Sequence, residues 1–363
     1  MQKKKPLLTV SIPTWNRGKY VRDAIDSIVS ETEKYGLQDE VEILVSDNGS
    51  DDDTQAVASE RQLRYPYVRY LRNERNMGLR FNILRSMREA GGDYCLLLGD
   101  DDRLVGGSLA KIVEKLREVG TVAAMFVQQA GSNFAFADID EDTFLSPQEI
   151  FGRYFWDMGN AGVFIVNAAA ARSIIDERGF EFFSHTWPQT QILCLSLAAD
   201  RRPALVTTIK AADSKLHDSL SIYSGNYLWR AAFADLLLAA HDLRPTLGDE
   251  FWRAASAYMY PRMSGIVNDV MFYGCLVDTE EQRRKAAESI RDVLPLLPWG
   301  LRLKALLLWA HVGLPRAAVA PLYRARLRLL YGPSVIRAGD ERARKEMEKR
   351  RLSVGEQGVR ELV

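Results

Sequence analysis

The chain has 363 residues, of which 47% are hydrophobic and 26% charged, and its formal net charge is zero. This composition is typical of a soluble globular protein of one or two domains, and a neutral chain has no overall field that would attract nucleic acid. Cys95, Cys194 and Cys275 are far apart in apolar runs, which indicates reduced core thiols of a cytoplasmic protein rather than a disulfide framework or a zinc site. No apolar run reaches the roughly 18 residues that a membrane-spanning helix needs.

The first hundred residues alternate short apolar runs with polar loops and helical patterns. Strands are expected over residues 7–12, 41–45, 67–71 and 94–98, and helices over 19–30, 55–62 and 80–90. Repeated strand, loop and helix units imply right-handed crossovers and a mainly parallel sheet. Such sheets bind ligands beyond the carboxyl ends of their strands. The loops that carry Thr14, Asp47, Gly78 and Asp100 are therefore expected in one cleft.

Three consecutive carboxylates, Asp100, Asp101 and Asp102, follow the fourth apolar run. Like charges at a strand end repel one another, which favours a cation between them. Mg²⁺ and Mn²⁺ prefer oxygen ligands, and Mg²⁺ commonly combines one or two carboxylates with substrate phosphates. Asp100 and Asp102 project to the same side of an extended segment, so these two are expected to hold one metal ion. The alternative is a solvated acidic turn before the helix that starts near residue 107.

The pattern changes after residue 222, where strand-like runs end and long helical patterns begin. We predict an α/β domain over residues 1–222, a helical region over 223–335 and a charged tail over 336–363. Residues 299–331 are rich in leucine and tryptophan and carry only basic charges. This pattern is typical of an interfacial helix on anionic lipid. A core helix hairpin with solvent-facing basic residues is the equal alternative.

Four motifs resemble family 2 of the glycosyltransferases in order and spacing, over roughly residues 7–116. They are residues 10–17 (Val-Ser-Ile-Pro-Thr-Trp-Asn-Arg), residues 45–54 (Val-Ser-Asp-Asn-Gly-Ser-Asp-Asp-Asp-Thr), Asn76-Met77-Gly78 with Asn82, and Leu98-Gly99-Asp100-Asp101-Asp102. The resemblance implies the GT-A fold, a Rossmann-like, mainly parallel sheet flanked by helices, here with an appended C-terminal helical region. It also implies a nucleotide diphosphate sugar donor and Mg²⁺ or Mn²⁺ as cofactor.

The resemblance implies nucleotide-binding roles for a set of loop residues. They are Pro13, Thr14, Trp15, Arg17, Asp47, Gly78, Arg80, Asp100 and Asp101. Asp47 would accept a hydrogen bond from the base, and Trp15 would stack on the base. The alternatives are that Asp47 caps the next helix and that Trp15 is a packed anchor of the loop. Thr14 would bond the nucleotide and Arg80 would face the diphosphate. The alternatives are a helix cap for Thr14 and a solvent-exposed arginine.

The metal ligands that the resemblance implies are Asp100 and Asp102, with His217 from a late polar loop. GT-A enzymes often bring such a histidine onto the metal and diphosphate, and an exposed loop histidine is the alternative. Gly99 stands where the family usually has an aspartate, so the alignment within the acidic run is open by one residue.

The general base is the main departure from the family. Inverting members carry a Glu-Asp pair after the metal motif, whereas residues 182–191 contain no carboxylate. His185 is the first candidate, because an unperturbed histidine pKa of about 6.5 suits deprotonation of an acceptor hydroxyl. Asp157, among aromatic residues, is the second. A packed histidine and a surface aspartate are the alternatives.

These features predict a cytoplasmic, metal-dependent, inverting hexosyl- or deoxyhexosyltransferase. The acidic run and the absent Glu-Asp pair resemble the abequosyltransferase-type bacterial members that build O-antigen and other surface polysaccharides. That resemblance implies a lipid-linked or polysaccharide acceptor and peripheral contact with the inner membrane surface. One alternative is a non-catalytic nucleotide-sugar-binding homologue that lacks the base. A nucleotidyltransferase is less favoured, because residues 13–16 are not the glycine-rich basic loop it would need.

Overall fold

The computed structural model describes residues 4–130, 139–155, 157–213, 229, 233–331 and 333–357. The chain forms two compact units, one of Met1–His217 with Thr246–Ala254 and the other of Asp218–Pro245 with Ala255–Val363. The domain boundary predicted between residues 222 and 223 lies outside the described residues.

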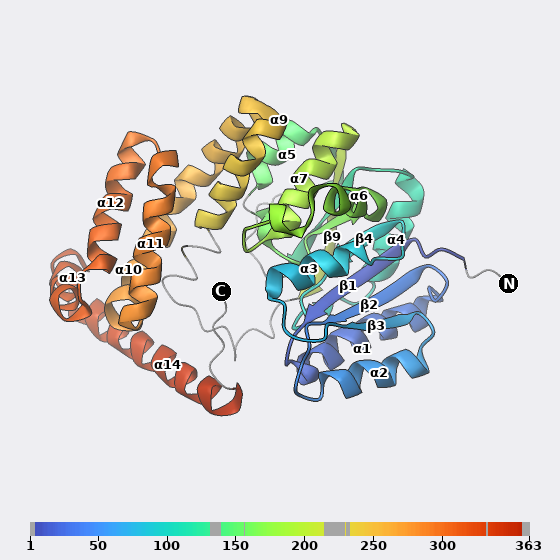
Figure 1. Ribbon diagram of the computed structural model, residues 1–363, viewed down its shortest axis with the longest axis horizontal. Coiled ribbons are helices and arrows are strands. Elements are labelled where there is room, and N and C mark those ends of the chain that lie inside the picture. Colours follow the sequence, from blue (N-terminus) through green and yellow to red (C-terminus); the bar gives the residue numbers. More distant parts are fainter. Residues whose placement is uncertain are drawn as a thin grey trace. The chain divides into compact units, whose positions relative to one another are not determined.

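A nine-stranded sheet forms the centre of the first unit's described part (Figure 1). Its order is β3-β2-β1-β4-β8-β6-β9-β5, and β7 pairs with β9. The strands are β1 Leu8–Thr14, β2 Val41–Asp47, β3 Val68–Arg72, β4 Tyr94–Leu97, β5 Arg103–Leu104, β6 Ala124–Ala130, β7 Thr143–Leu145, β8 Phe164–Asn167 and β9 Ala204–Asp213. Strands β1 to β4 are parallel, as predicted. Strand β8 runs antiparallel to both β4 and β6, which the sequence analysis did not predict.

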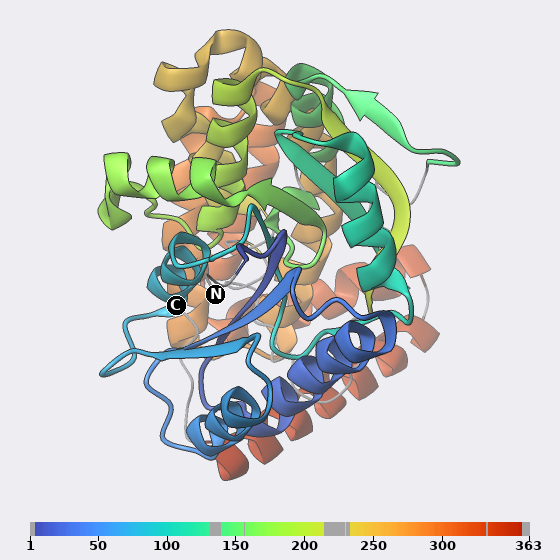
Figure 2. The ribbon, with the colours of Figure 1, turned by 90° about the vertical axis from the view of Figure 1, so that its right-hand side faces the viewer.

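Helices cover both faces of this sheet. They are α1 Gly18–Tyr35, α2 Thr54–Arg64, α3 Leu79–Arg88, α4 Ser108–Val119, α5 Pro147–Tyr154, α6 Ala168–Arg178 and α7 Pro188–Asp200, with short 3₁₀ turns η2 Asp157–Gly159 and η3 Phe180–Phe182. Helices α1, α2 and α4 lie on one face and α3, α6 and α7 on the other. Figure 2 shows α1 and α2, in blue, on the same side of the blue strands. The predicted α/β architecture is confirmed.

The alternation of β1 builds the core. Leu8, Val10 and Ile12 are fully buried in the cluster that includes Ile25 and Ile28 of α1. Because successive strand side chains point to opposite faces, the residues between them face the other helical layer. The strand thus contributes to both layers while its carboxyl end stays available for polar residues.

Pro13 corrects one expectation, because it lies inside β1 and not in a loop. Pairing of β1 with β4 ends at Ser11 opposite Leu97, and the Ser11 carbonyl accepts the N–H of Leu98. The Thr14 carbonyl accepts from Asn48 on the β2 side. The N–H that proline lacks would therefore point toward β4, beyond the last paired residue. Proline at this position costs no ladder hydrogen bond.

The three cysteines are free and buried. Burial raises the pKa of the Cys95 and Cys275 thiols to about 12. This confirms the prediction of buried, unbridged thiols.

The second unit is helical, as predicted for the C-terminal region (Figure 1). Its helices are α10 Met263–Leu276, α11 Glu280–Val293, α12 Trp299–Gly313, α13 Arg316–Tyr331 and α14 Pro333–Gln357, with 3₁₀ turns η6 Tyr260–Arg262 and η7 Leu294–Leu296, and α9 Asp235–Met259 contributes to both units. In the part of the chain that the structure describes, every helix is too short or too polar to traverse a bilayer.

A buried arginine ties three of these helices together. Arg283 of α11 donates to the backbone carbonyls of Gly274, near the end of α10, and of His311 and Leu314, at the end of α12. The last carbonyls of a helix lack partners within the helix, so a cation there is favourable. Arg283 thereby ties the C-terminal end of α12 to α10 and α11.

Candidate functional site

Three parallel strands bring polar residues to one edge of the sheet. Thr14, at the end of β1, is in register with Asp47, at the end of β2. The Thr14 hydroxyl donates to Oδ2 of Asp100 over 2.7 Å. Asn48 donates its backbone N–H to the Thr14 carbonyl and its side-chain amide to the Gly78 carbonyl, at 2.9 and 3.1 Å. The loops predicted to converge are therefore linked by direct hydrogen bonds.

The acidic run lies immediately beyond β4. Asp100 and Asp102 are 6% and 4% exposed. Arg17 contacts two members of the run, with Nη1 2.9 Å from Oδ1 of Asp100 and Nη2 2.7 Å from Oδ2 of Asp101. Burial alone would lower the pKa of Arg17, but the two carboxylates outweigh it and the pKa lies above its usual value. Asp100 and Asp101 are thus held at the strand end by Thr14 and Arg17 of the protein itself.

Gly99 lies close to the carboxylates of both Asp101 and Asp102. A Cβ at this position would lie 2.7 Å from Oδ2 of Asp102 and 3.2 Å from Oδ1 of Asp101. A Cβ on Gly162 would lie 3.9 Å from the same Asp102 oxygen. A side chain at residue 99 would collide with the Asp102 carboxylate, so this close approach of the acidic run to its own backbone requires glycine at residue 99.

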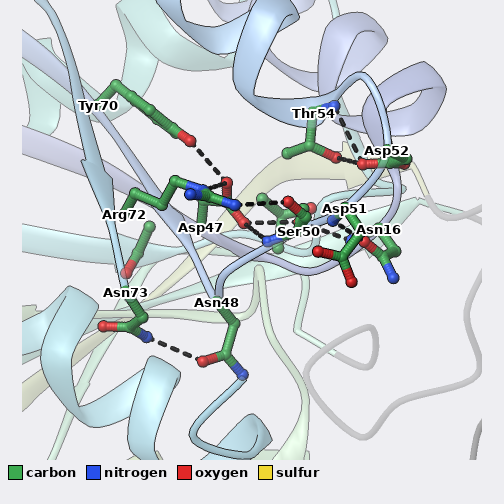
Figure 3. A network of polar contacts seen from close by, with 12 residues as sticks. Asn16, Asp47, Asn48, Ser50, Asp51, Asp52, Thr54, Tyr70, Arg72 and Asn73 are labelled. Carbon is green, nitrogen blue, oxygen red and sulfur yellow. Dashed lines mark hydrogen bonds and ion pairs between the residues drawn. The ribbon is translucent and has the colours of Figure 1, made fainter. Parts of the chain in front are cut away.

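Asp47 is fully buried at the centre of a hydrogen-bond network (Figure 3). Its Oδ1 accepts from the backbone N–H and the hydroxyl of Ser50, at 2.9 and 2.6 Å. Its Oδ2 accepts from the Tyr70 hydroxyl at 2.6 Å and lies 3.4 Å from Nε of Arg72. Burial and then the bond to Asp47 raise the pKa of Tyr70. Both carboxylate oxygens are therefore already engaged, Oδ1 by the loop after β2 and Oδ2 by β3.

Asn48 organises the loop that leads into α3. Its Oδ1 accepts from the Asn73 side chain and from the backbone N–H of Met77, each at 2.9 Å, and its amide donates to Asn76 at 2.7 Å. Gly49 has a φ of +73°, and a Cβ there would lie 2.6 Å from the backbone of Arg75. The loops after β2 and β3 can pack this closely only with glycine at residue 49.

The loops after β1 and β2 are also joined to each other (Figure 3). Asn16, at φ +52°, accepts the Asp51 N–H with its side chain and donates its own N–H to the Ser50 hydroxyl, both at 2.7 Å. Asp52 accepts from the N–H of Gly18 at 3.0 Å. Asparagine tolerates the left-handed region better than most residues. The two loops therefore form one connected surface.

Helix α3 contributes one residue that faces inward and one that reaches another segment. Asn82 is buried and donates to the carbonyls of Ser46 and Thr14, so it serves the backbone at the ends of β2 and β1. Arg80 donates to the Phe183 carbonyl at 2.9 Å and lies 3.8 Å from Glu181. Arg80 therefore does not simply face solvent, because its guanidinium already contacts Phe183 and Glu181.

The two candidate bases differ in exposure. His185 is half-buried in the segment before α7, two residues after the carbonyl that Arg80 contacts. Asp157 is 2% exposed in η2. Gln189 and Thr190 of α7 donate to carbonyls of η2, at 2.9 and 3.1 Å, and hold this turn in place.

Three predicted residues remain to be placed. Trp15 and Pro13 are half-buried at the end of β1. Gly78 has a φ of +89° and directly precedes α3. His217 lies outside the described residues.

Sequence reasoning missed Tyr70, Arg72 and Asn73 as parts of the site. Tyr70 and Arg72 come from β3, and nothing in the local pattern of that strand links them to Asp47. Asn73 stands in the same loop as Asn76, and the two asparagines in one turn were the available signal.

Comparison with known proteins identifies the sequence family of this site. Residues 9–180 match the glycosyl transferase family 2 model. This segment is a family 2 glycosyltransferase domain. The matched segment contains nearly all of β1, strands β2 to β4, the loops that follow these strands, and the first residue of η3, but not the segment with His185.

Curated relatives match about a third of the chain. Abequosyltransferase RfbV of Salmonella typhimurium strain LT2 is 39% identical over 105 residues, which are 29% of this chain and 31% of that protein. The GalNAc(5)-diNAcBac-PP-undecaprenol beta-1,3-glucosyltransferase of Campylobacter jejuni is 33% identical over 114 residues, 31% of this chain and 35% of that protein. The chain thus spans about a third of the length of these relatives.

Solved structures resemble the chain over almost all its length. TarS 1–349 of S. aureus has a TM-score of 0.57 and 14% sequence identity, over 96% of this chain and 92% of that one, and it has also been solved with UDP-GlcNAc and with UDP. The mannosyltransferase PcManGT of Pyrobaculum calidifontis, in complex with GDP-Man and Mn²⁺, has a TM-score of 0.51 and 13% identity, over 97% of this chain and 88% of that one. At these identities the likeness concerns the fold, and the predicted GT-A fold is confirmed.

Proposed function

We propose that this protein transfers a sugar from a nucleotide diphosphate sugar to a hydroxyl acceptor, with inversion at the anomeric carbon. The observation that supports this most is the buried acidic run at the end of β4, hydrogen-bonded to Thr14 within a family 2 domain. The relatives' names, an abequosyltransferase and a glucosyltransferase, support sugar transfer. We assign donor binding and catalysis to residues 1–222.

Asp101 and Asp102 are the residues whose chemistry suits Mg²⁺ or Mn²⁺. One oxygen of each lies close to Gly99, and hard cations favour carboxylate oxygens. Among the described residues, no group of three or more histidine, cysteine, aspartate or glutamate side chains is arranged to hold a metal ion. One or two carboxylates with substrate phosphates are sufficient for Mg²⁺. Asp100 and His217 are the further proposed ligands, and the bound ion would neutralise charge on the departing diphosphate.

The nucleotide is proposed to lie along the connected loops after β1 and β2. Trp15 would stack on the base, Thr14 would bond the nucleotide, and Arg80 would face the diphosphate. For Asp47, a base N–H would have to replace one of the present donors from Ser50 or Tyr70, because both oxygens are already engaged. The backbone of this loop is therefore the more accessible partner for a base.

His185 is the proposed general base. A base must be within hydrogen-bond reach of the acceptor hydroxyl, and a half-buried imidazole is more accessible than the carboxylate of Asp157 at 2% exposure. Asp157 would then stabilise η2, which precedes the Gly162 turn beside Asp102.

A donor panel tests the proposal. We expect the full-length protein, with Mn²⁺, to release nucleoside diphosphate from one of the UDP-, GDP-, CDP- or dTDP-sugars, and His185→Ala to lower that rate by about 10²–10⁴-fold. Lys19→Ala, which changes an exposed residue of α1, is the control. Binding of a nucleotide without turnover of any donor would instead indicate a non-catalytic binding protein.

The acceptor is proposed to be lipid-linked, and α12 offers the surface for membrane contact. Ala305, Leu308 and Val312 of this helix are buried. On the opposite side, Trp299, Leu303 and Leu307 are 77%, 52% and 66% exposed. We name these last three residues the α12 stripe. One apolar face of α12 is already buried within the unit, so the opposite apolar face is the one left for a binding partner to cover.

The charge around the α12 stripe favours an anionic membrane as this partner. Arg302 and Lys304 flank the stripe on either side, by the 100° rotation per residue of a helix. Residues 299–331 contain no aspartate or glutamate. Tryptophan and leucine bordered by basic residues are typical of helices that lie in the headgroup region. We therefore propose that the protein binds peripherally to the inner membrane surface, where its acceptor would be found.

Vesicle co-sedimentation tests membrane contact. Wild type should sediment with vesicles of phosphatidylglycerol and phosphatidylcholine, and the triple change of the α12 stripe to serine should weaken binding at least about tenfold. Leu63→Ser is the matched control, because Leu63 of α2 is 87% exposed and lies in the other unit. Equal sedimentation of wild type and the triple variant would contradict the proposal.

A further inference from the structure

Arg17 is a cation fixed between two members of the acidic run. It directly precedes α1, and its backbone N–H donates to the Thr54 hydroxyl at 3.2 Å. Its guanidinium lies 4.9 Å from the centre of the Tyr20 ring and contacts Asp100 and Asp101 at 2.9 and 2.7 Å. The side chain is 22% exposed. These contacts hold the guanidinium beside the acidic run, where it acts as a counter-ion to Asp100 and Asp101.

The contacts of Asp101 put Arg17 in conflict with a second cation. Oδ2 of Asp101 contacts Arg17, while Oδ1 lies on the side of Gly99, 3.2 Å from where a Cβ on that residue would stand. A divalent ion bound through Oδ1 would share Asp101 with the guanidinium. Two cations on one carboxylate repel each other and divide its charge, most strongly where water is scarce. Arg17 should therefore weaken the binding of a metal ion on its own.

We propose that Arg17 competes with the divalent metal for Asp100 and Asp101, and that it turns to the diphosphate of the donor when metal and donor bind together. The inference rests on the proposed function for the identity of these ligands. A guanidinium forms paired hydrogen bonds with phosphate oxygens as readily as with carboxylates. The same residue would thus oppose metal binding alone and favour the complex of metal with nucleotide.

Titration with Mn²⁺ alone tests the competition. Free Mn²⁺ is followed by electron paramagnetic resonance for full-length wild type, Arg17→Gln and Arg22→Gln. We expect Arg17→Gln to bind Mn²⁺ about fivefold to tenfold more tightly than wild type, since coupling between neighbouring sites has this order of size. Arg22→Gln should match wild type, because Arg22, also near the start of α1, is 43% exposed and lies 3.9 Å from Asp53, outside the acidic run. The two variants change the net charge equally.

Nucleotide binding gives the second arm of the test. In the presence of Mn²⁺, Arg17→Gln should bind UDP or GDP more weakly than wild type, opposite in sign to its effect on Mn²⁺ alone. Arg17→Lys keeps the charge but loses the paired contact, so it should gain less Mn²⁺ affinity than Arg17→Gln. It also serves if the glutamine variant fails to fold. Mn²⁺ affinity of the Arg17 variants at or below that of wild type, or no Mn²⁺ binding to any of them, would overturn the inference.

The donor panel separates this inference from the proposed function. If Arg17→Gln binds Mn²⁺ more tightly but wild type turns over no donor, competition between Arg17 and the metal is supported and the transferase proposal is contradicted. If wild type turns over a donor but Arg17→Gln binds Mn²⁺ no more tightly than wild type, the transferase proposal is supported and the competition is contradicted.

Discussion

Changing Asp102 to asparagine should lower donor turnover by about 10²–10³-fold, the cost typical of losing one preorganised electrostatic group at a reacting centre. The substitution keeps the side chain's shape and removes its charge. Asp102 is 4% exposed and its Oδ2 lies close to Gly99 within the acidic run, where a neutral amide would coordinate a metal ion less well than a carboxylate. The measurement is the steady-state rate with saturating Mn²⁺ and the donor that the panel identifies.

The control for this variant comes from the other end of the same strand. Asp93 precedes β4 at the opposite edge of the sheet, is 50% exposed and pairs with Lys5 at 2.6 Å. Asp93→Asn should leave turnover within about twofold of wild type, as expected for an exposed pair of this kind. Calorimetry adds a second readout. If Asp102→Asn turns over donor at the wild-type rate and binds nucleoside diphosphate with wild-type affinity in the presence of Mn²⁺, the acidic run has no role in the mechanism.

Replacing Asp47 with alanine should lower the free energy of unfolding of the first unit by about 3–5 kcal/mol. The substitution leaves the Ser50 hydroxyl, the Ser50 N–H and the Tyr70 hydroxyl without their common acceptor. Buried donors that lose a charged acceptor stay shielded from water without a hydrogen bond, and this desolvation penalty destabilises the folded state. Urea denaturation followed by circular dichroism measures the change.

Two further variants show whether the effect belongs to the network. Tyr70→Phe removes one donor and should cost about 1–2 kcal/mol, because Arg72 stays beside the same Asp47 oxygen. Asp53→Ala changes a side chain of the same loop that is 63% exposed, and should have little effect. If Asp47→Ala unfolds at the urea concentration of wild type, Asp47 is dispensable for the loop and is the better candidate for a base contact.

The parallel part of the sheet was predictable because its signals are local. Each of β1 to β4 is a short apolar run followed by turn residues, and the carboxyl ends of parallel strands meet by topology. The direction of β8 was not predictable in this way, since residues 164–167 read equally well in either orientation. Likewise, the position of Pro13 within β1 depends on where β4 stops pairing, which is a property of its neighbour.

The site was predictable in its positions but only partly in its contacts. The motifs located Asp47 and the acidic run, because glycine, asparagine and aspartate mark strand ends. The partners of these residues are distant in sequence: Tyr70 is 23 residues from Asp47, and Asp101 is 84 residues from Arg17. An ion pair of this separation leaves no periodic trace in the sequence. Tertiary structure alone assigns Arg17 to the acidic run.

The reversed direction of β8 has a consequence for how such a protein can diversify. Because β8 runs against β4, the chain reaches the edge that holds Asp102 through residues 157–162, on its way into the sheet. Lengthening or shortening this approach would leave the registers of β1, β2 and β4 untouched. Loops tolerate such changes far better than paired strands do. Related proteins could thus differ in their acceptors through changes in residues 157–162, while the donor-binding loops after β1, β2 and β4 stay the same.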